Sequence, residues 1–95
     1  MTEFFYRWRR AGKGEEVDPP PPHLLPLVDE VFYWTLKQQR GISFVDLGHV
    51  PSPALLAALD AYSMGLNWAE NELAEEAKEA AERERREAER RGGAR

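Results

Sequence analysis

Residues 22–66 read PHLLPLVDEVFYWTLKQQRGISFVDLGHVPSPALLAALDAYSMGL and hold most of the large apolar side chains of the 95-residue chain. Their spacing predicts two helices joined by a bent loop. In the first helix, residues 23–40, apolar positions cover most of the circumference, so this helix packs on two sides or holds a partner on one of them. Gly41 is expected to end it, because glycine accepts the left-handed conformation that closes many helices.

The second predicted helix begins at Ser52-Pro53, where a capping serine precedes a proline at the first helical position. It is expected to run to about Met64, with Gly65 as its left-handed terminator. The loop before it, residues 42–53, is expected to be ordered and to contain one short strand at most. A lone histidine near an aspartate, such as His49 near Asp46, is typical of a turn contact, since no nucleophile motif accompanies the pair.

A third helix is predicted over residues 68–91, which become almost wholly Glu, Arg and Ala after Glu82. Three pairs spaced i, i+4 support it: Glu79–Arg83, Glu82–Arg86 and Glu87–Arg91. No leucine follows Leu73, so a two-stranded coiled coil is poorly supported. The fold class is therefore all-α, with three helices, a long charged C-terminal helix and an irregular or short-strand N-terminal arm. The expected core is Leu25, Val28, Val31, Phe32, Leu36, Leu55, Leu56, Leu59, Tyr62, Leu66 and Leu73.

The predicted organisation has three parts: an arm and linker (1–18), a helical core domain (19–75) and a solvated helix with a frayed end (76–95). The alternating aromatic and basic residues of the arm favour a short strand or turn docked on the core. The same residues would also suit a peptide that binds a partner protein, a single-stranded nucleic acid or a membrane surface. Gly12 and Gly14 loosen the linker. Pro19–Pro22 predict a stiff polyproline spacer, with a ligand for an aromatic groove as the alternative.

The composition and charge of the chain argue against several classes of function. The net charge of −4 argues against general duplex-DNA binding, which needs a basic surface, and the absence of cysteine excludes disulfides and thiolate metal sites. No apolar run approaches a membrane span, and the arginines follow the aromatics at the N-terminus, unlike a secretory signal. We therefore expect a cytoplasmic protein. No catalytic motif is present, and His23 and His49 lie far apart without a liganding cluster, so neither enzymatic activity, nor a metal, nor a cofactor is expected.

The unusual feature is the density of aromatic residues. Consecutive aromatics on a helix point about 100° apart, so at least one of residues 32–34 should lie at the surface or at an interface. Tyr and Trp are enriched where partners bind. The candidate partner-binding residues are Phe5, Tyr6, Trp8, Tyr33, Trp34 and Trp68, with a wet rim position on the core as the alternative.

The order of features also resembles a known family. A proline-rich acidic lead enters an aromatic helix in PPPPHLLPLVDEVFYW, QQRG breaks it, VPSPALLAALDAY begins the next helix, and an acidic helix follows. Over about residues 18–75 this resembles the small tail assembly chaperones of long-tailed bacteriophages, especially their downstream, tail-binding part. The resemblance implies a non-enzymatic helical protein that binds the tape measure protein, recruits tail tube subunits and is absent from the finished tail. It assigns no binding residue, and the helix after Glu75 is longer than it requires.

The expected function is therefore that of a phage tail assembly chaperone, acting in the host cytoplasm through protein contacts. The alternative is a self-associating structural or adaptor protein of a virion or prophage, a homo-oligomer that covers its own apolar patch. A third possibility is a small nucleic-acid-binding regulator, which only Arg7, Arg9 and Arg10 support.

Overall fold

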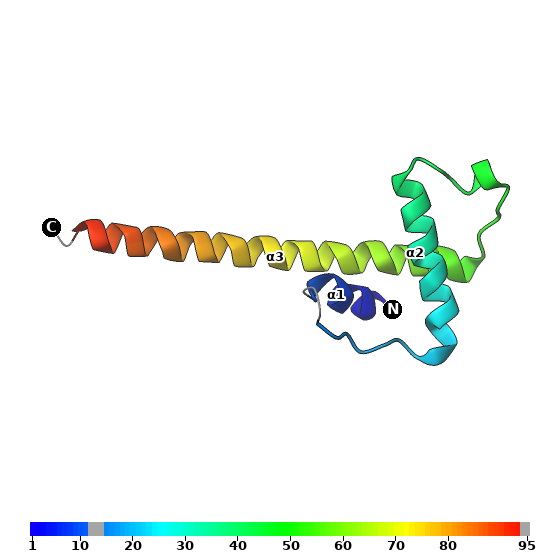
Figure 1. Ribbon diagram of the computed structural model, residues 1–95, viewed down its shortest axis with the longest axis horizontal. Helices are drawn as coiled ribbons and strands as arrows, with labels where there is room; N and C mark the ends of the chain where they lie inside the picture. The colour runs from blue at the N-terminus through cyan, green and yellow to red at the C-terminus, as the bar shows by residue number, and fades with distance from the viewer. Residues whose placement is uncertain (12–14, 94–95) are drawn as a thin grey trace.

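A long straight helix supports the rest of the molecule in the computed structural model, which describes residues 1–11 and 15–93 (Figure 1). The helices are α1 (Thr2–Arg10), α2 (Leu25–Gln39) and α3 (Pro53–Gly93), with short 3₁₀ turns at Pro22–Leu24 and Val45–Leu47. Helix α2 crosses the first turns of α3, and α1 lies along its middle. No strand forms among the residues that the structure describes, so the predicted all-α class is confirmed.

The N-terminal arm is helical, and the prediction of an irregular or short-strand arm is wrong. The alternation of aromatics and arginines suggested a strand, but Met1, Phe5 and Trp8 follow the i, i+4, i+7 spacing of one helix face. Glu3 and Arg7, one turn apart, form an ion pair of 2.6 Å on the outer side. Gly12 and Gly14, which were predicted to loosen the linker, lie outside the described residues.

Helix α2 begins and ends as its sequence indicates. Pro26 lies in the first turn, where the missing N–H costs no helical hydrogen bond. At the other end Gly41 adopts a φ of 78° and donates its N–H to Gln38 O, while Ile42 donates to Lys37 O at 3.0 Å. These two bonds form a Schellman motif, so the predicted termination at Gly41 is confirmed.

The loop between α2 and α3 is ordered without a strand. Its 3₁₀ turn, Val45–Leu47, is closed by Gly48 in the left-handed conformation, with a φ of 63°. The ring of Trp34 on α2 holds the loop, with centroids 4.4 Å from Phe44 and 4.9 Å from His49. The bent loop is thereby fixed to α2 through the buried ring of Trp34.

Helix α3 is continuous through 41 residues, so the two separate helices predicted over 53–64 and 68–91 are wrong. Its start is as predicted, because Leu55 donates its N–H to the capping hydroxyl of Ser52 at 3.1 Å. Gly65 does not end a helix; it is the point where α1 crosses. A Cβ on Gly65 would lie 2.6 Å from Thr2 O and 2.9 Å from Tyr6 N, so only glycine allows this approach.

The core forms where the three helices meet. Its buried side chains are Phe5, Val28, Val31, Trp34, Leu55 and Ala58, with Phe32, Leu59, Tyr62 and Leu66 packed against them. Of the predicted core, Leu25, Leu36 and Leu56 are instead exposed. Helix α2 packs through Val28, Val31 and Trp34, which leaves Leu25 and Leu36 of the same helix in solvent.

Charged contacts tie α1 to the middle of α3. Arg9 pairs with Glu70 at 2.8 Å, and Arg10 pairs with Glu76 at 2.8 Å. This last ion pair lies at residue 76, where the sequence predicted the boundary between the core domain and the solvated helix. Beyond it α3 projects alone, which gives the molecule its extents of 69 × 30 × 21 Å (Figure 1).

Candidate protein-binding surface

Two of the six predicted partner-binding residues belong to the core. Phe5 is fully buried and meets Phe32 and Tyr62 edge to face, and Trp34 is 5% exposed beneath the α2–α3 loop. Each ring is buried against other residues of the chain because it lies on the inward face of its helix. This corrects the candidate set, since neither ring can contact a partner without unfolding its surroundings.

Two more aromatics on α1 are partly committed to intramolecular contacts. The Tyr6 hydroxyl donates a hydrogen bond to the Glu72 carboxylate, which raises the pKa of Tyr6 above its ordinary value. Trp8 lies 5.0 Å from the Phe32 ring, with 41% of its surface exposed. Tyr6 therefore positions α1 on α3, and Trp8 covers the ring cluster while keeping one face in solvent.

Tyr33 and Trp68 are the most exposed of the six, each at 50%. Tyr33 lies on α2 against the edge of Trp34, with the Lys37 ammonium 5.4 Å above its ring. Trp68 lies on α3 beside the first turn of α1, in an open hollow of about 620 Å³. That hollow is lined by Met1, Thr2, Glu3, Tyr6, Trp68 and Glu72. The two rings belong to different helices and different surroundings, so they are separate candidate contacts.

A second hollow, of about 190 Å³, adjoins the first because Met1 lines both. Every residue that lines it is apolar: Met1, Leu24, Leu27, Ala54, Ala57, Ala58 and Ala61. Along α3 this surface continues toward the C-terminus, since Ala57, Ala61, Met64 and Trp68 follow the i, i+4, i+7, i+11 spacing of one face. We call this surface, from Leu24 and Leu27 to Trp68, the apolar groove.

Sequence reasoning missed the groove apart from Trp68. Met64 is 44% exposed and stands one turn before Trp68 on the same face. The spacing from Ala57 to Trp68 was visible in the sequence, but reading Gly65 as a helix end divided it between two helices. Met1 adds a contact between α1 and α3 that no local pattern could reveal.

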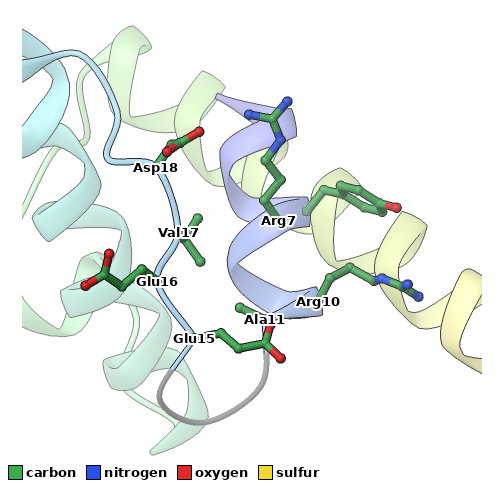
Figure 2. A pocket seen from close by; sticks show the side chains of 8 residues that line it. Arg7, Arg10, Ala11, Glu15, Glu16, Val17 and Asp18 are labelled. Carbon is green, nitrogen blue, oxygen red and sulfur yellow. The ribbon is translucent and has the colours of Figure 1, made fainter.

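A third hollow lies between α1 and the segment that leads to the proline run (Figure 2). Glu15, Val17 and Asp18 face α1 across it, whereas Glu16 points away. The arginines on the α1 side, Arg7 and Arg10, already pair with Glu3 and Glu76. Little uncompensated positive charge remains there to hold an anion.

The proline run continues as a strap from this segment to α2. Pro20 is buried, and Pro19, Pro20 and Pro21 line a shallow hollow against Phe4. Pro21 has φ −50° and ψ 140°, near the polyproline conformation. The run thus faces α1 across this hollow on its way to α2, and its role as a stiff spacer stays a prediction.

His49 and Asp46 make separate contacts. The Asp46 carboxylate accepts hydrogen bonds from the Ser43 N–H at 2.8 Å and hydroxyl at 3.0 Å, which lower the pKa of Asp46. His49 stacks on Trp34 instead. The interpretation of Asp46 as a turn contact is confirmed.

Across residues 1–11 and 15–93, no three His, Asp or Glu side chains gather as a set of metal ligands. Within the same residues, no helix combines the length and the apolar character needed to cross a membrane. Comparison with known protein families, with curated proteins and with solved structures finds no significant match to this chain.

Proposed function

We propose that this chain is a non-enzymatic assembly factor that binds a helical segment of a partner protein in the apolar groove. The observation that carries the proposal is the exposure of Met64 and Trp68, at 44% and 50%, in line with a hollow lined only by apolar residues. Amphipathic helices dock in such grooves through anchors at i, i+3, i+4 and i+7. An apolar surface of this kind, next to a half-exposed tryptophan, is typical of a protein contact site.

The partner that the sequence resemblance suggests is a phage tail protein, namely the tape measure protein or a tail tube subunit. A chaperone of this class has to hold an extended helical protein without joining the finished structure. A groove on a small helical body would do so through reversible contacts of modest area.

The test is co-expression and co-purification with a phage tape measure protein or a tail tube protein, where the neighbouring genes encode them. Retention of either one by the tagged chain, and its loss with Trp68→Ala, would support the proposal. Leu36→Ala is the control, because Leu36 is a large apolar residue of similar exposure, 53%, that lies on α2 outside the groove. Equal loss with both variants, or retention of no tail protein, would count against it.

The alternative of self-association uses the same apolar surface, with a second copy as the occupant. Sedimentation equilibrium separates the two possibilities. A monomer at all concentrations favours a different protein as the occupant, and a concentration-dependent dimer that Trp68→Ala abolishes favours a second copy.

A further inference from the structure

The groove does not end at Trp68, because its face of α3 continues as a row of carboxylates. Glu75, Glu79 and Glu82 each follow an apolar groove residue, Ala57, Ala61 and Met64 respectively, by 18 residues. Eighteen residues are about five turns, so each glutamate lies on the same side of α3 as its apolar counterpart. One face of the helix is thus apolar over its first half and acidic over the next two turns.

These carboxylates form no ion pair with another described residue of the chain. Glu70, Glu72 and Glu76 of α3 pair with arginines of α1. In contrast, no basic side chain of the described residues lies within 4.0 Å of the Glu75 or Glu79 carboxylate. Of the three ion pairs predicted along α3, only Glu87–Arg91 forms, at 3.5 Å. The predicted Glu79–Arg83 and Glu82–Arg86 pairs are farther apart than 4.0 Å.

The two carboxylates beside Trp68 are balanced by arginines of α1. Glu3 and Glu72 line the hollow beside its ring, each with one arginine already in contact. Along the same face the next base after Glu82 is Arg86, which stands five turns after Trp68 and marks the end of the acidic stretch. The unpaired negative charge of this face therefore lies at Glu75, Glu79 and Glu82, beginning two turns after Trp68 at the C-terminal end of the apolar groove.

We infer that the occupant of this face is a basic amphipathic helix, with apolar anchors for the groove followed on the same side by Lys or Arg for Glu75, Glu79 and Glu82. The inference rests on the proposed function and specifies the chemistry of its partner. The apolar half supplies the contact area, and the carboxylates fix the direction of the bound helix and reject acidic competitors.

The probe is a fluorescein-labelled synthetic helix of about five turns, with three leucines and three lysines on one side, made with the lysines at either end. A second peptide carries glutamines in place of the lysines. Fluorescence anisotropy with the full chain should give tighter binding for one lysine peptide than for its glutamine counterpart. The difference should shrink as salt is added, because exposed charge pairs are screened.

Two matched double variants locate the charge effect. Glu75→Gln with Glu79→Gln should weaken binding of the lysine peptide by roughly twofold to thirtyfold, the range for two exposed ion pairs. Glu84→Gln with Glu87→Gln removes the same charge from the same helix away from this face: Glu84 lies half a turn from Glu75, and Glu87, which pairs with Arg91, lies a third of a turn from it. This variant should leave the affinity unchanged. Equal weakening by both variants would overturn the inference, because the effect would then be that of overall charge.

Trp68→Ala separates this inference from the proposed function. If lysine and glutamine peptides bind equally and both lose affinity with Trp68→Ala, the groove is a binding site and the basic partner is refuted. If neither lysine peptide binds, the inference is also refuted, and co-purification with the tail proteins decides the proposed function independently.

Discussion

Substituting Gly65 by alanine tests the packing on which the fold depends. In an isolated helix, alanine at an interior position is more favourable than glycine by about 0.8–1.0 kcal/mol. At the crossing of α1 and α3, however, the added methyl group would lie 2.6 Å from Thr2 O, 2.9 Å from Tyr6 N and 3.0 Å from Phe5 Cβ. None of these atoms is the end of a flexible side chain, so α1 as a whole has to move.

Two responses are open to the protein, and both cost more than the gain in propensity. Overpacking that keeps α1 in place typically costs about 1–3 kcal/mol. Release of α1 exposes Phe5, whose burial contributes about 1.5–3 kcal/mol, and removes ring contacts worth about 0.5–1.5 kcal/mol each. The cheaper response sets the loss, so after subtraction of the propensity gain we expect the free energy of unfolding to fall by up to about 2 kcal/mol, at about 4–8 °C in Tm for each kcal/mol.

Gly92→Ala is the matched control, because Gly92 lies in the same helix and a Cβ there meets nothing within 4 Å. Thermal and urea unfolding followed by far-UV circular dichroism should show Gly92→Ala equal to or slightly more stable than the parent chain. The indole N–H resonance of Trp8 in NMR spectra reports separately whether α1 leaves the ring cluster. If Gly65→Ala proves as stable as Gly92→Ala with α1 still in place, the crossing geometry is wrong.

Three further predictions concern single contacts. Phe5→Ala should lower the free energy of unfolding by about 3–5 kcal/mol, measured by urea denaturation, and a loss below about 1 kcal/mol would contradict the burial of this ring. Ser52→Ala should cost about 0.5–2 kcal/mol because the Leu55 N–H loses its capping acceptor, and calorimetry that finds no loss would exclude that cap. The hydrogen bonds from Ser43 lower the pKa of Asp46 from its ordinary 3.8, so their stabilisation is present above that pH and disappears as the pH falls through the lower folded value. The Ser43 amide shift should follow this titration in NMR spectra, and in Asp46→Asn it should not.

The sequence allowed the helical class and several element boundaries to be predicted because local chemistry determines them. A serine followed by proline began α3, and a glycine with φ of 78° ended α2, each through bonds within a few residues of the chain. The turn of Asp46 is equally local. The buried residues Val28, Val31 and Leu55 followed from helical periodicity within the same elements.

The errors arose where distant residues decide the outcome. A glycine in an apolar helix can end the helix or admit a neighbour, and only the position of α1 above Gly65 distinguishes the two. The nine residues of α1 are too few to form a stable helix alone, so their conformation depends on docking rather than on propensity. The burial of Phe5 depends on the same docking, and that of Trp34 depends on the α2–α3 loop. The sequence alone therefore could not show that these two rings are buried rather than available to a partner.

The two faces of α3 are linked through α1. One side of α3 accepts α1 at Gly65, while an adjacent side carries Met64 and Trp68, and Met1 at the start of α1 lines both hollows there. Movement of α1 at the crossing therefore moves a wall of the apolar groove. The glycine that allows close packing inside the molecule thus also determines the shape of the surface proposed for the partner.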